Sequence, residues 1–171
     1  MKTALISGGA KRIGVQIVRT LHEDGYKVII HCHQSEEIAQ ALCHELNSKR
    51  NSSAQVVVAD LGDNEAIKKL TQTIKSLDLL VNNASVFYPT SIENSTIENW
   101  DKIININLRA PFFISTELSK VLAVNQGSIV NIIDIHSDRP LKKFSIYNIS
   151  KAGMKMLTKT LAKELAPNIR V

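Results

Sequence analysis

Short apolar runs alternate with helical patterns along almost the whole of this chain. Each apolar run has the length of a buried strand, and the runs occupy residues 3–7, 26–31, 55–59, 77–81 and 128–133. Apolar positions at helical spacing fill the intervals, at residues 13–21, 35–50, 63–75, 96–122 and 147–165. This alternation predicts a parallel sheet with helices on both faces, which is a three-layer, doubly wound α/β fold.

Two details refine this prediction. Pro111 lies inside the long helical pattern at residues 96–122 and predicts an interruption or kink there. The last residues, 169–171, read as the start of a sixth strand. A chain of 171 residues with 44% hydrophobic content can bury a substantial core, so we expect one domain over residues 1–171.

Charge and cysteine content narrow the class of protein. The net charge of +5 is spread along the chain without basic runs, which favours an anionic small molecule over a nucleic acid as partner. Cys32 and Cys43 form no CxxC pair and are interpreted as reduced thiols of a cytoplasmic protein. His31, Cys32 and His33 alternate faces in a strand, so we expect no metal site. No signal peptide or membrane span is predicted.

A glycine-rich turn follows the first predicted strand. The sequence S-G-G-A-K-R-I-G places Gly8, Gly9 and Gly14 between that strand and the helix after it. Such glycines let the backbone approach a pyrophosphate, whose charge is met by the helix N-terminus. Glycines also end strands for purely structural reasons, so this turn alone only suggests a dinucleotide site.

The second predicted strand ends without an acidic side chain. A binder of unphosphorylated NAD usually has an acid there, whereas this chain has residues 31–35, H-C-H-Q-S. Glu36 and Glu37 come later, in the first turn of the next helix, where they favour the helix dipole. Histidine and serine can donate hydrogen bonds to a 2′-phosphate, and Lys11 and Arg12 add positive charge. We therefore predict NADP(H) as the cofactor.

Polar residues also follow the fourth and fifth predicted strands. Residues 82–85, N-N-A-S, follow the fourth strand, and Asp134 ends the fifth. Because ligands bind at the carboxyl ends of parallel strands, these residues are candidates for the site. Phe87 comes shortly after, either as a stacking ring or as a core aromatic. Asn107 lies in the long helix, where a packing role is the more common one.

Tyr147 and Lys151 stand four residues apart in the last helix and share one of its faces. A charge pair at about 4 Å and a dielectric near 20 is worth up to roughly 4 kcal/mol, so the ammonium could lower the tyrosine pKa by about three units. On its own this pair also fits a solvated helix face.

The glycine turn, N-N-A, the helical Asn107 and Tyr-x-x-x-Lys in this order resemble the short-chain dehydrogenase/reductase family. The resemblance covers the chain from its first strand to Val171. S-G-G-A-K-R-I-G, H-C-H-Q-S, N-N-A-S-V-F-Y-P-T and D-I-H-S-D-R-P-L are similar to pteridine reductases. In particular, Asp134 stands thirteen residues before the tyrosine, where most family members have a serine.

The resemblance implies a Rossmann-type sheet and a set of roles. Tyr147 is the general acid, Lys151 tunes it and binds the nicotinamide ribose, and Asp134 assists proton delivery for reduction of a pterin C=N bond. Asn107 holds the helix and an ordered water. The implied NADP(H) contacts are Gly8, Lys11, Arg12, Ile13, Gly14, His31, His33, Gln34, Ser35, Asp60, Leu61, Asn83, Ala84, Ser85, Tyr147 and Lys151. The implied substrate contacts are Arg12, Ser85, Phe87, Asp134 and Tyr147.

Two departures leave alternatives open. Gln34 stands where some pteridine reductases have an arginine, so less positive charge favours NADPH over NADH. The family's C-terminal strand and substrate-covering segment are absent, so the chain looks C-terminally truncated. The leading hypothesis is an NADPH-dependent reductase of dihydropterin or dihydrofolate-type substrates. The alternatives are a short-chain carbonyl reductase and a non-catalytic NADP-binding module or fragment. The resemblance also implies a homotetramer formed by the helices on either side of the fifth strand.

Overall fold

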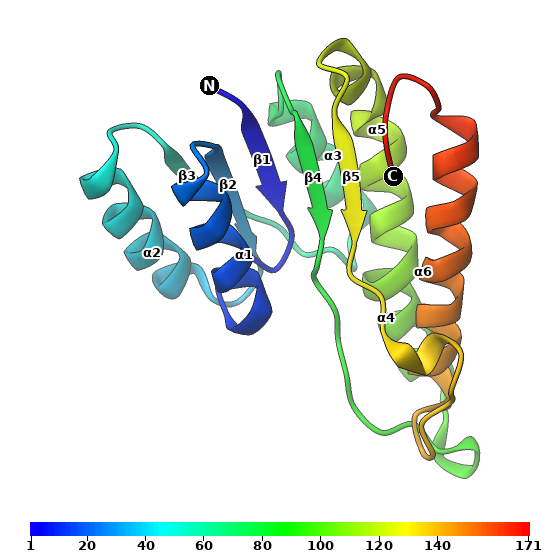
Figure 1. Ribbon diagram of the computed structural model, residues 1–171. Helices are drawn as coiled ribbons and strands as arrows, with labels where there is room; N and C mark the ends of the chain where they lie inside the picture. Colours follow the sequence, from blue (N-terminus) through cyan, green and yellow to red (C-terminus); the bar gives the residue numbers. More distant parts are fainter.

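Five parallel strands form the centre of the computed structural model, which describes residues 1–171 (Figure 1). The strands are β1 (Thr3–Ile6), β2 (Lys27–Cys32), β3 (Ala54–Val58), β4 (Leu79–Asn82) and β5 (Ser128–Asn131). They are ordered β3-β2-β1-β4-β5, and every neighbouring pair is parallel. The predicted doubly wound fold is confirmed. The strand order reverses between β1 and β4, which places a crevice at the carboxyl ends of these two strands.

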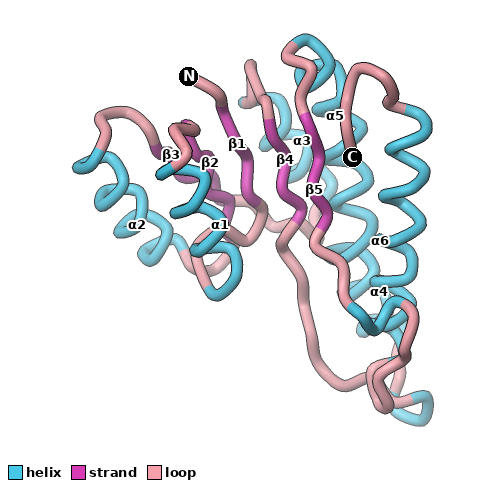
Figure 2. Tube along the Cα trace, viewed as in Figure 1, coloured by secondary structure: helices cyan, strands magenta, loops and turns pink.

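Helices cover both faces of the sheet, as Figure 2 shows. One face carries α1 (Arg12–Glu23) and α2 (Glu36–Lys49), and the other carries α3 (Asn64–Thr73), α5 (Ala110–Val124) and α6 (Ser145–Glu164). The short helix α4 (Ile97–Ile104) precedes α5 and packs against α6. The α6 helix lies beside the β5 edge, where the Asn131 side-chain amide donates to Thr158 Oγ1 at 2.9 Å.

Alternate strand residues enter two separate cores. Leu5 and Leu80 belong to the cluster shared with α3 and α5, whereas Ile6 and Val81 belong to the cluster shared with α1 and α2. Because neighbouring residues of one strand point to opposite faces, both faces must be apolar when both are covered by helices. This is why the strands read as continuous apolar runs in the sequence.

The long helical pattern is interrupted immediately before Pro111. The α4 helix ends at Ile104, a π-helical segment spans Asn105–Arg109, and α5 starts at Ala110. Proline has no backbone N–H, so it cannot bond the carbonyl of Asn107 four residues earlier. The interruption sets the position of Asn107, which lies in the π-helical segment.

The chain's last residues run beside β5. Ile129 N–H donates to Arg170 O at 2.8 Å, and Arg170 N–H donates to Gly127 O at 3.2 Å, in a parallel bridge between Ser128 and Arg170. This pairing is the start of the predicted sixth strand. None of the helices combines the length and the apolar composition that crossing a membrane would require.

Candidate functional site

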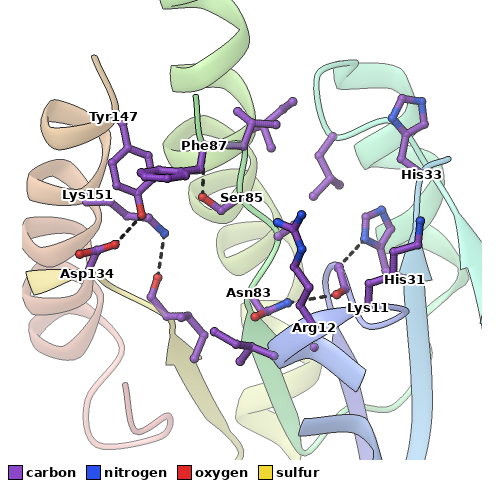
Figure 3. Close-up of a pocket in the computed structure, with 18 of the residues that line it drawn as sticks. Lys11, Arg12, His31, His33, Asn83, Ser85, Phe87, Asp134, Tyr147 and Lys151 are labelled. Atoms are coloured by element: carbon purple, nitrogen blue, oxygen red, sulfur yellow. Dashed lines mark hydrogen bonds between the residues drawn. The ribbon is translucent and has the colours of Figure 1, made fainter. Parts of the chain in front are cut away.

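A cavity of about 470 Å³ lies at the carboxyl ends of β1, β4 and β5 (Figure 3). Most of the residues proposed from the sequence line it: Gly8, Lys11, Arg12, Ile13, Gly14, His31, His33, Asp60, Leu61, Asn83, Ala84, Ser85, Phe87, Asp134, Tyr147 and Lys151. The lining also includes four apolar residues that the sequence did not suggest: Val86, Ile106, Ile132 and Ile133. Ile132 and Ile133 directly follow β5, Val86 lies in the segment after β4 and Ile106 lies in the π-helical segment, and no sequence signal marks them because an aliphatic side chain carries no chemistry of its own.

The backbone of the glycine turn requires glycine both for its dihedral angles and for its close packing. Gly8 has φ +63°, and a Cβ on Gly14 would lie 2.0 Å from Gly8 O. The α1 helix starts at Arg12 with no side-chain cap and no acid in its first turn, so its first N–H groups are available to an anion. Arg12 itself has φ +52°, a conformation rare for a side chain of this size. The turn therefore fits a pyrophosphate.

Hydrogen bonds fasten this turn to the end of β4. The Asn83 side-chain amide donates to Ser7 O at 3.0 Å and to Gly8 O at 3.1 Å. Ser7 Oγ accepts in return from the N–H groups of Asn83 and Ala84 at 2.9 and 3.0 Å. Asn83 thus holds the cofactor crevice at a fixed width, and it does so through contacts within the protein.

His31 lines the cavity, but its two ring nitrogens are already engaged. Nδ1 accepts from Gly8 N–H at 3.1 Å, which leaves Nε2 to donate to Ala59 O at 3.1 Å. Burial lowers the pKa of His31 to about 4, so the ring is neutral. His31 therefore has no N–H left for a 2′-phosphate, since its single N–H donates to Ala59 O, just after β3.

Stability should fall on acidification because of His31. The pKa is lower in the folded chain than in the unfolded chain, so the stabilisation is complete above about pH 6.5 and is lost as the pH falls toward 4. We expect a loss of about 3 kcal/mol of unfolding free energy over this window. Urea denaturation at several pH values measures it. His31→Gln should flatten the curve, and an unchanged slope in that variant would contradict the assignment.

The residues expected around a 2′-phosphate are divided between two places. His33 Nε2 lies 3.9 Å from Asp60 Oδ2 in the main cavity. Gln34 and Ser35 lie outside this cavity and line a second depression at the start of α2, and Lys11 lines both. Two carboxylates share that depression, Glu36 and Glu37, so the positive charge of Lys11 is partly offset there.

Asn107 does not line the cavity and is 1% exposed. Its Oδ1 accepts from Val86 N–H at 2.8 Å, and its Nδ2 donates to Val86 O at 3.0 Å and to Ser150 Oγ at 3.2 Å. The amide therefore links Val86, in the segment after β4, to Ser150 of α6. Ser150 Oγ in turn donates to Tyr147 O at 2.7 Å. These contacts fill both side-chain donors, so the side chain is a positioning group with no free donor for a water.

Tyr147, Asp134 and Lys151 meet at the other end of the cavity (Figure 3). The Tyr147 hydroxyl donates to Asp134 Oδ2 at 2.7 Å, and the His136 N–H donates to Asp134 Oδ1 at 2.9 Å. Lys151 Nζ donates to Ile132 O at 3.1 Å and lies 5.7 Å from the centre of the Tyr147 ring. The side chains that the sequence proposed as catalytic are thus grouped, apart from Asn107.

The ionisation of this group differs from the sequence-based expectation. Burial, and then the Asp134 carboxylate beside the hydroxyl, raise the pKa of Tyr147 well above its ordinary value. Partial burial works to raise the pKa of Asp134, but hydrogen bonds from His136 and Tyr147 outweigh it and hold that pKa low. Burial lowers the pKa of Lys151. The expectation that Lys151 depresses the tyrosine pKa is wrong for this state, because the nearest charge to the phenol is negative.

Phe87 projects at the mouth of the cavity. Its side chain is 55% exposed, which excludes the core-aromatic alternative. The ring stacks on Phe144 with centroids 4.5 Å apart and planes 13° apart, and it meets the Tyr147 ring edge-on at 4.8 Å. One planar surface is thus offered beside the tyrosine. That Phe87 stacks on a substrate stays a prediction.

No group of three or more potential ligands among His, Cys, Asp and Glu side chains is arranged to hold a metal ion. Cys32 and Cys43 are both buried and free.

Comparison with known proteins agrees with this geometry. A family model described as short chain dehydrogenase matches residues 2–171. A short-chain type dehydrogenase/reductase of Picea abies is 32% identical, covering 96% of this chain and 65% of that protein. Pteridine reductase 1 of Leishmania tarentolae is 31% identical, covering 95% and 71%. A solved short chain dehydrogenase/reductase family protein superimposes with a TM-score of 0.92 at 28% identity, covering 99% and 71%.

The chain therefore belongs to the short-chain dehydrogenase family. It spans about two thirds of the length of the relatives described above.

Proposed function

We propose that this chain is the catalytic part of an NADPH-dependent reductase that acts on a dihydropterin or dihydrofolate-type substrate. One observation carries the proposal: the Tyr147 hydroxyl in the cavity donates to the Asp134 carboxylate at 2.7 Å. A phenol and a carboxylate in contact can deliver and replace a proton at a ring nitrogen. The similarity to pteridine reductase 1 of Leishmania tarentolae supports this choice.

The proposed chemistry assigns each group a separate task. When bound, NADPH supplies the hydride to the carbon of a C=N bond. Tyr147 holds the proton for the adjacent nitrogen, and its raised pKa keeps that proton in place at neutral pH. Asp134, a carboxylate at that pH, orients the hydroxyl, and once Tyr147 has given its proton to the substrate nitrogen, Asp134 relays a solvent proton back to the phenolate. Lys151 is fixed by Ile132 O beside the tyrosine ring and would hold the nicotinamide ribose.

The test is NADPH oxidation in the presence of a dihydropterin, with ketones and aldehydes as the comparison. Turnover of the dihydropterin above that of every carbonyl compound supports the proposal. A preference for carbonyl compounds would favour the alternative, a short-chain carbonyl reductase, since Tyr147 and Lys151 serve that reaction as well. Tight NADPH binding without any turnover would favour a non-catalytic binding module.

NADP(H) is the cofactor that we propose, because Lys11 and Arg12 line the cavity and β2 ends without an acidic side chain. Lys11 lines both the main cavity and the depression at the start of α2, where a 2′-phosphate would lie. We expect Lys11→Ala to weaken NADPH binding about tenfold and NADH binding less than about twofold, because only the phosphate loses a charged partner. Calorimetry with both cofactors measures this. An equal loss for both cofactors would contradict a role at the phosphate.

A homo-oligomer, by resemblance a tetramer, is part of the proposal. Large apolar side chains are exposed on both helices that flank β5: Phe112 and Phe113 on α5, and Ile149 and Met156 on α6. Burial of such a surface in an interface is favourable. Sedimentation of the protein, compared with a Phe113→Glu variant, tests the assembly.

The two free thiols fit a cytoplasmic location, which we also propose.

A further inference from the structure

Two loops that follow neighbouring strands are fastened together beside α6. One loop follows β4 (residues 83–96) and the other follows β5 (residues 132–144), and they meet beyond the sheet near their far ends, where Thr90 and Phe144 form a parallel bridge (Figure 1). The junction is Thr90, which is only 1% exposed although it lies in a loop. Its N–H donates to Lys143 O at 2.7 Å, and its carbonyl accepts from Ser145 N–H at 3.1 Å and from Ser145 Oγ.

Thr90 also caps the helix that carries the tyrosine. The α6 helix starts at Ser145, and the preceding residue, Phe144, has no side-chain acceptor for the first N–H groups. Thr90 supplies the acceptors from the other loop: its carbonyl serves Ser145 N–H, and its Oγ1 accepts from Ile146 N–H at 3.3 Å. The helix N-terminus is therefore completed by the segment that carries Phe87.

The backbone on the α6 side of this junction is strained. Lys143 has φ +70°, a conformation that side chains other than glycine rarely adopt, and it is the Lys143 carbonyl that accepts from Thr90 N–H. Such strain persists where the surrounding contacts determine the geometry, and it gathers at functional sites.

Phe87 lies between two fixed points of its loop. Asn107 holds Val86 on one side by two hydrogen bonds, and Thr90 is held by residues 143–146 on the other. Phe87 itself is 55% exposed, so burial contributes little to its position. Its ring nevertheless stacks on Phe144 and meets Tyr147 at 4.8 Å.

We propose that Thr90 is a positioning residue that locks the β4 loop onto the catalytic helix and so fixes the Phe87 ring against Tyr147. The proposal rests on the proposed function, because the surface that Phe87 offers is argued to receive a planar substrate ring. Thr90 is not one of the residues that line the cavity. Its effect should therefore fall on substrate binding and leave NADPH binding unchanged.

Thr90→Val tests this directly, because it keeps the shape of the side chain and removes the Oγ1 acceptor. The Ile146 N–H then loses its partner, and we expect KM for a dihydropterin to rise about tenfold. The kcat should change less than about threefold, and Kd for NADPH should stay the same. Thr90→Ser restores the acceptor and should bring KM back to the wild-type value.

A matched control is Thr96→Val, in the same loop. Thr96 caps α4 by accepting from Asn99 N–H at 3.2 Å and has no bond to α6. It should leave KM unchanged, whereas a rise equal to that of Thr90→Val would overturn the proposal. An unchanged KM in Thr90→Val, or a parallel rise of its Kd for NADPH, would overturn it as well.

Hydrogen exchange separates this proposal from the proposed function. If the wild-type protein reduces no dihydropterin, the proposed function fails, but the loop still has to be ordered by Thr90. Faster amide exchange at residues 86–88 in Thr90→Val, with unchanged exchange in the β1 strand, supports the positioning role. Unchanged exchange at residues 86–88 overturns it.

Discussion

Tyr147→Phe should reduce kcat for dihydropterin reduction by about 10³-fold while leaving Kd for NADPH within about twofold. The substitution removes one hydroxyl and keeps the ring that packs edge-on against Phe87. A positioned general acid contributes about 10²–10⁴-fold to a rate. Tyr147 is the side chain in the cavity that donates a hydrogen bond to Asp134. Single-turnover measurement of NADPH oxidation checks the chemical step without interference from product release.

The control for this variant is its cofactor affinity and thermal stability. Asp134 keeps its hydrogen bond from His136 N–H when the phenol is removed, so we expect the fold to tolerate the change. Phe87→Ala, by contrast, leaves the proton donor in place and should mainly raise KM. Undiminished turnover by Tyr147→Phe would remove tyrosine from the mechanism, whatever the substrate.

The sheet could be predicted from the sequence because its signals are local. Buried parallel strands must be apolar on both faces, so runs such as residues 26–31 could be placed within a residue or two of β2. Pro111 marked the helix interruption because the lack of an N–H is a property of the residue itself. The glycine turn could be predicted as well, because the lack of a Cβ is likewise a property of the residue itself.

The contacts inside the site could not be predicted, because they depend on partners far apart in the chain. His31 reads as a donor at a strand end, yet its ring serves Gly8 and Ala59. Asn107 was assigned a water, yet both N–H groups of its amide are used by Val86 O and Ser150 Oγ. Spacing places a residue on a face, but the tertiary fold decides which neighbours satisfy its polar atoms.

The tyrosine pKa shows the same limit in electrostatic terms. Helical spacing correctly brought Lys151 close to Tyr147, but the charge in hydrogen-bond contact with the phenol is that of Asp134. Burial and the hydrogen-bonded Asp134 carboxylate both favour the neutral phenol and raise its pKa. The tyrosine of the free protein is therefore protonated at neutral pH, and it is a weaker acid than an ordinary phenol.

Asp134→Asn should separate the charge of this carboxylate from its shape. Asp134 raises the pKa of Tyr147, so the wild-type tyrosine keeps its proton to high pH and kcat/KM should fall only at strongly alkaline pH. Without the negative charge the pKa of Tyr147 is lower, and the alkaline fall of kcat/KM moves to lower pH. The variant should also lose about 10²-fold in dihydropterin turnover at neutral pH, because the tyrosine is reprotonated less readily.

Asp134→Ser completes the comparison, because serine removes the carboxylate and keeps a small polar side chain. If the enzyme is a pterin reductase, the serine variant should lose dihydropterin turnover about as much as the asparagine variant. If it is a carbonyl reductase, both variants should retain ketone reduction, since a carbonyl oxygen needs only the tyrosine proton. A pH profile of the asparagine variant that coincides with the wild-type profile would show that the Asp134 charge does not set the ionisation of Tyr147.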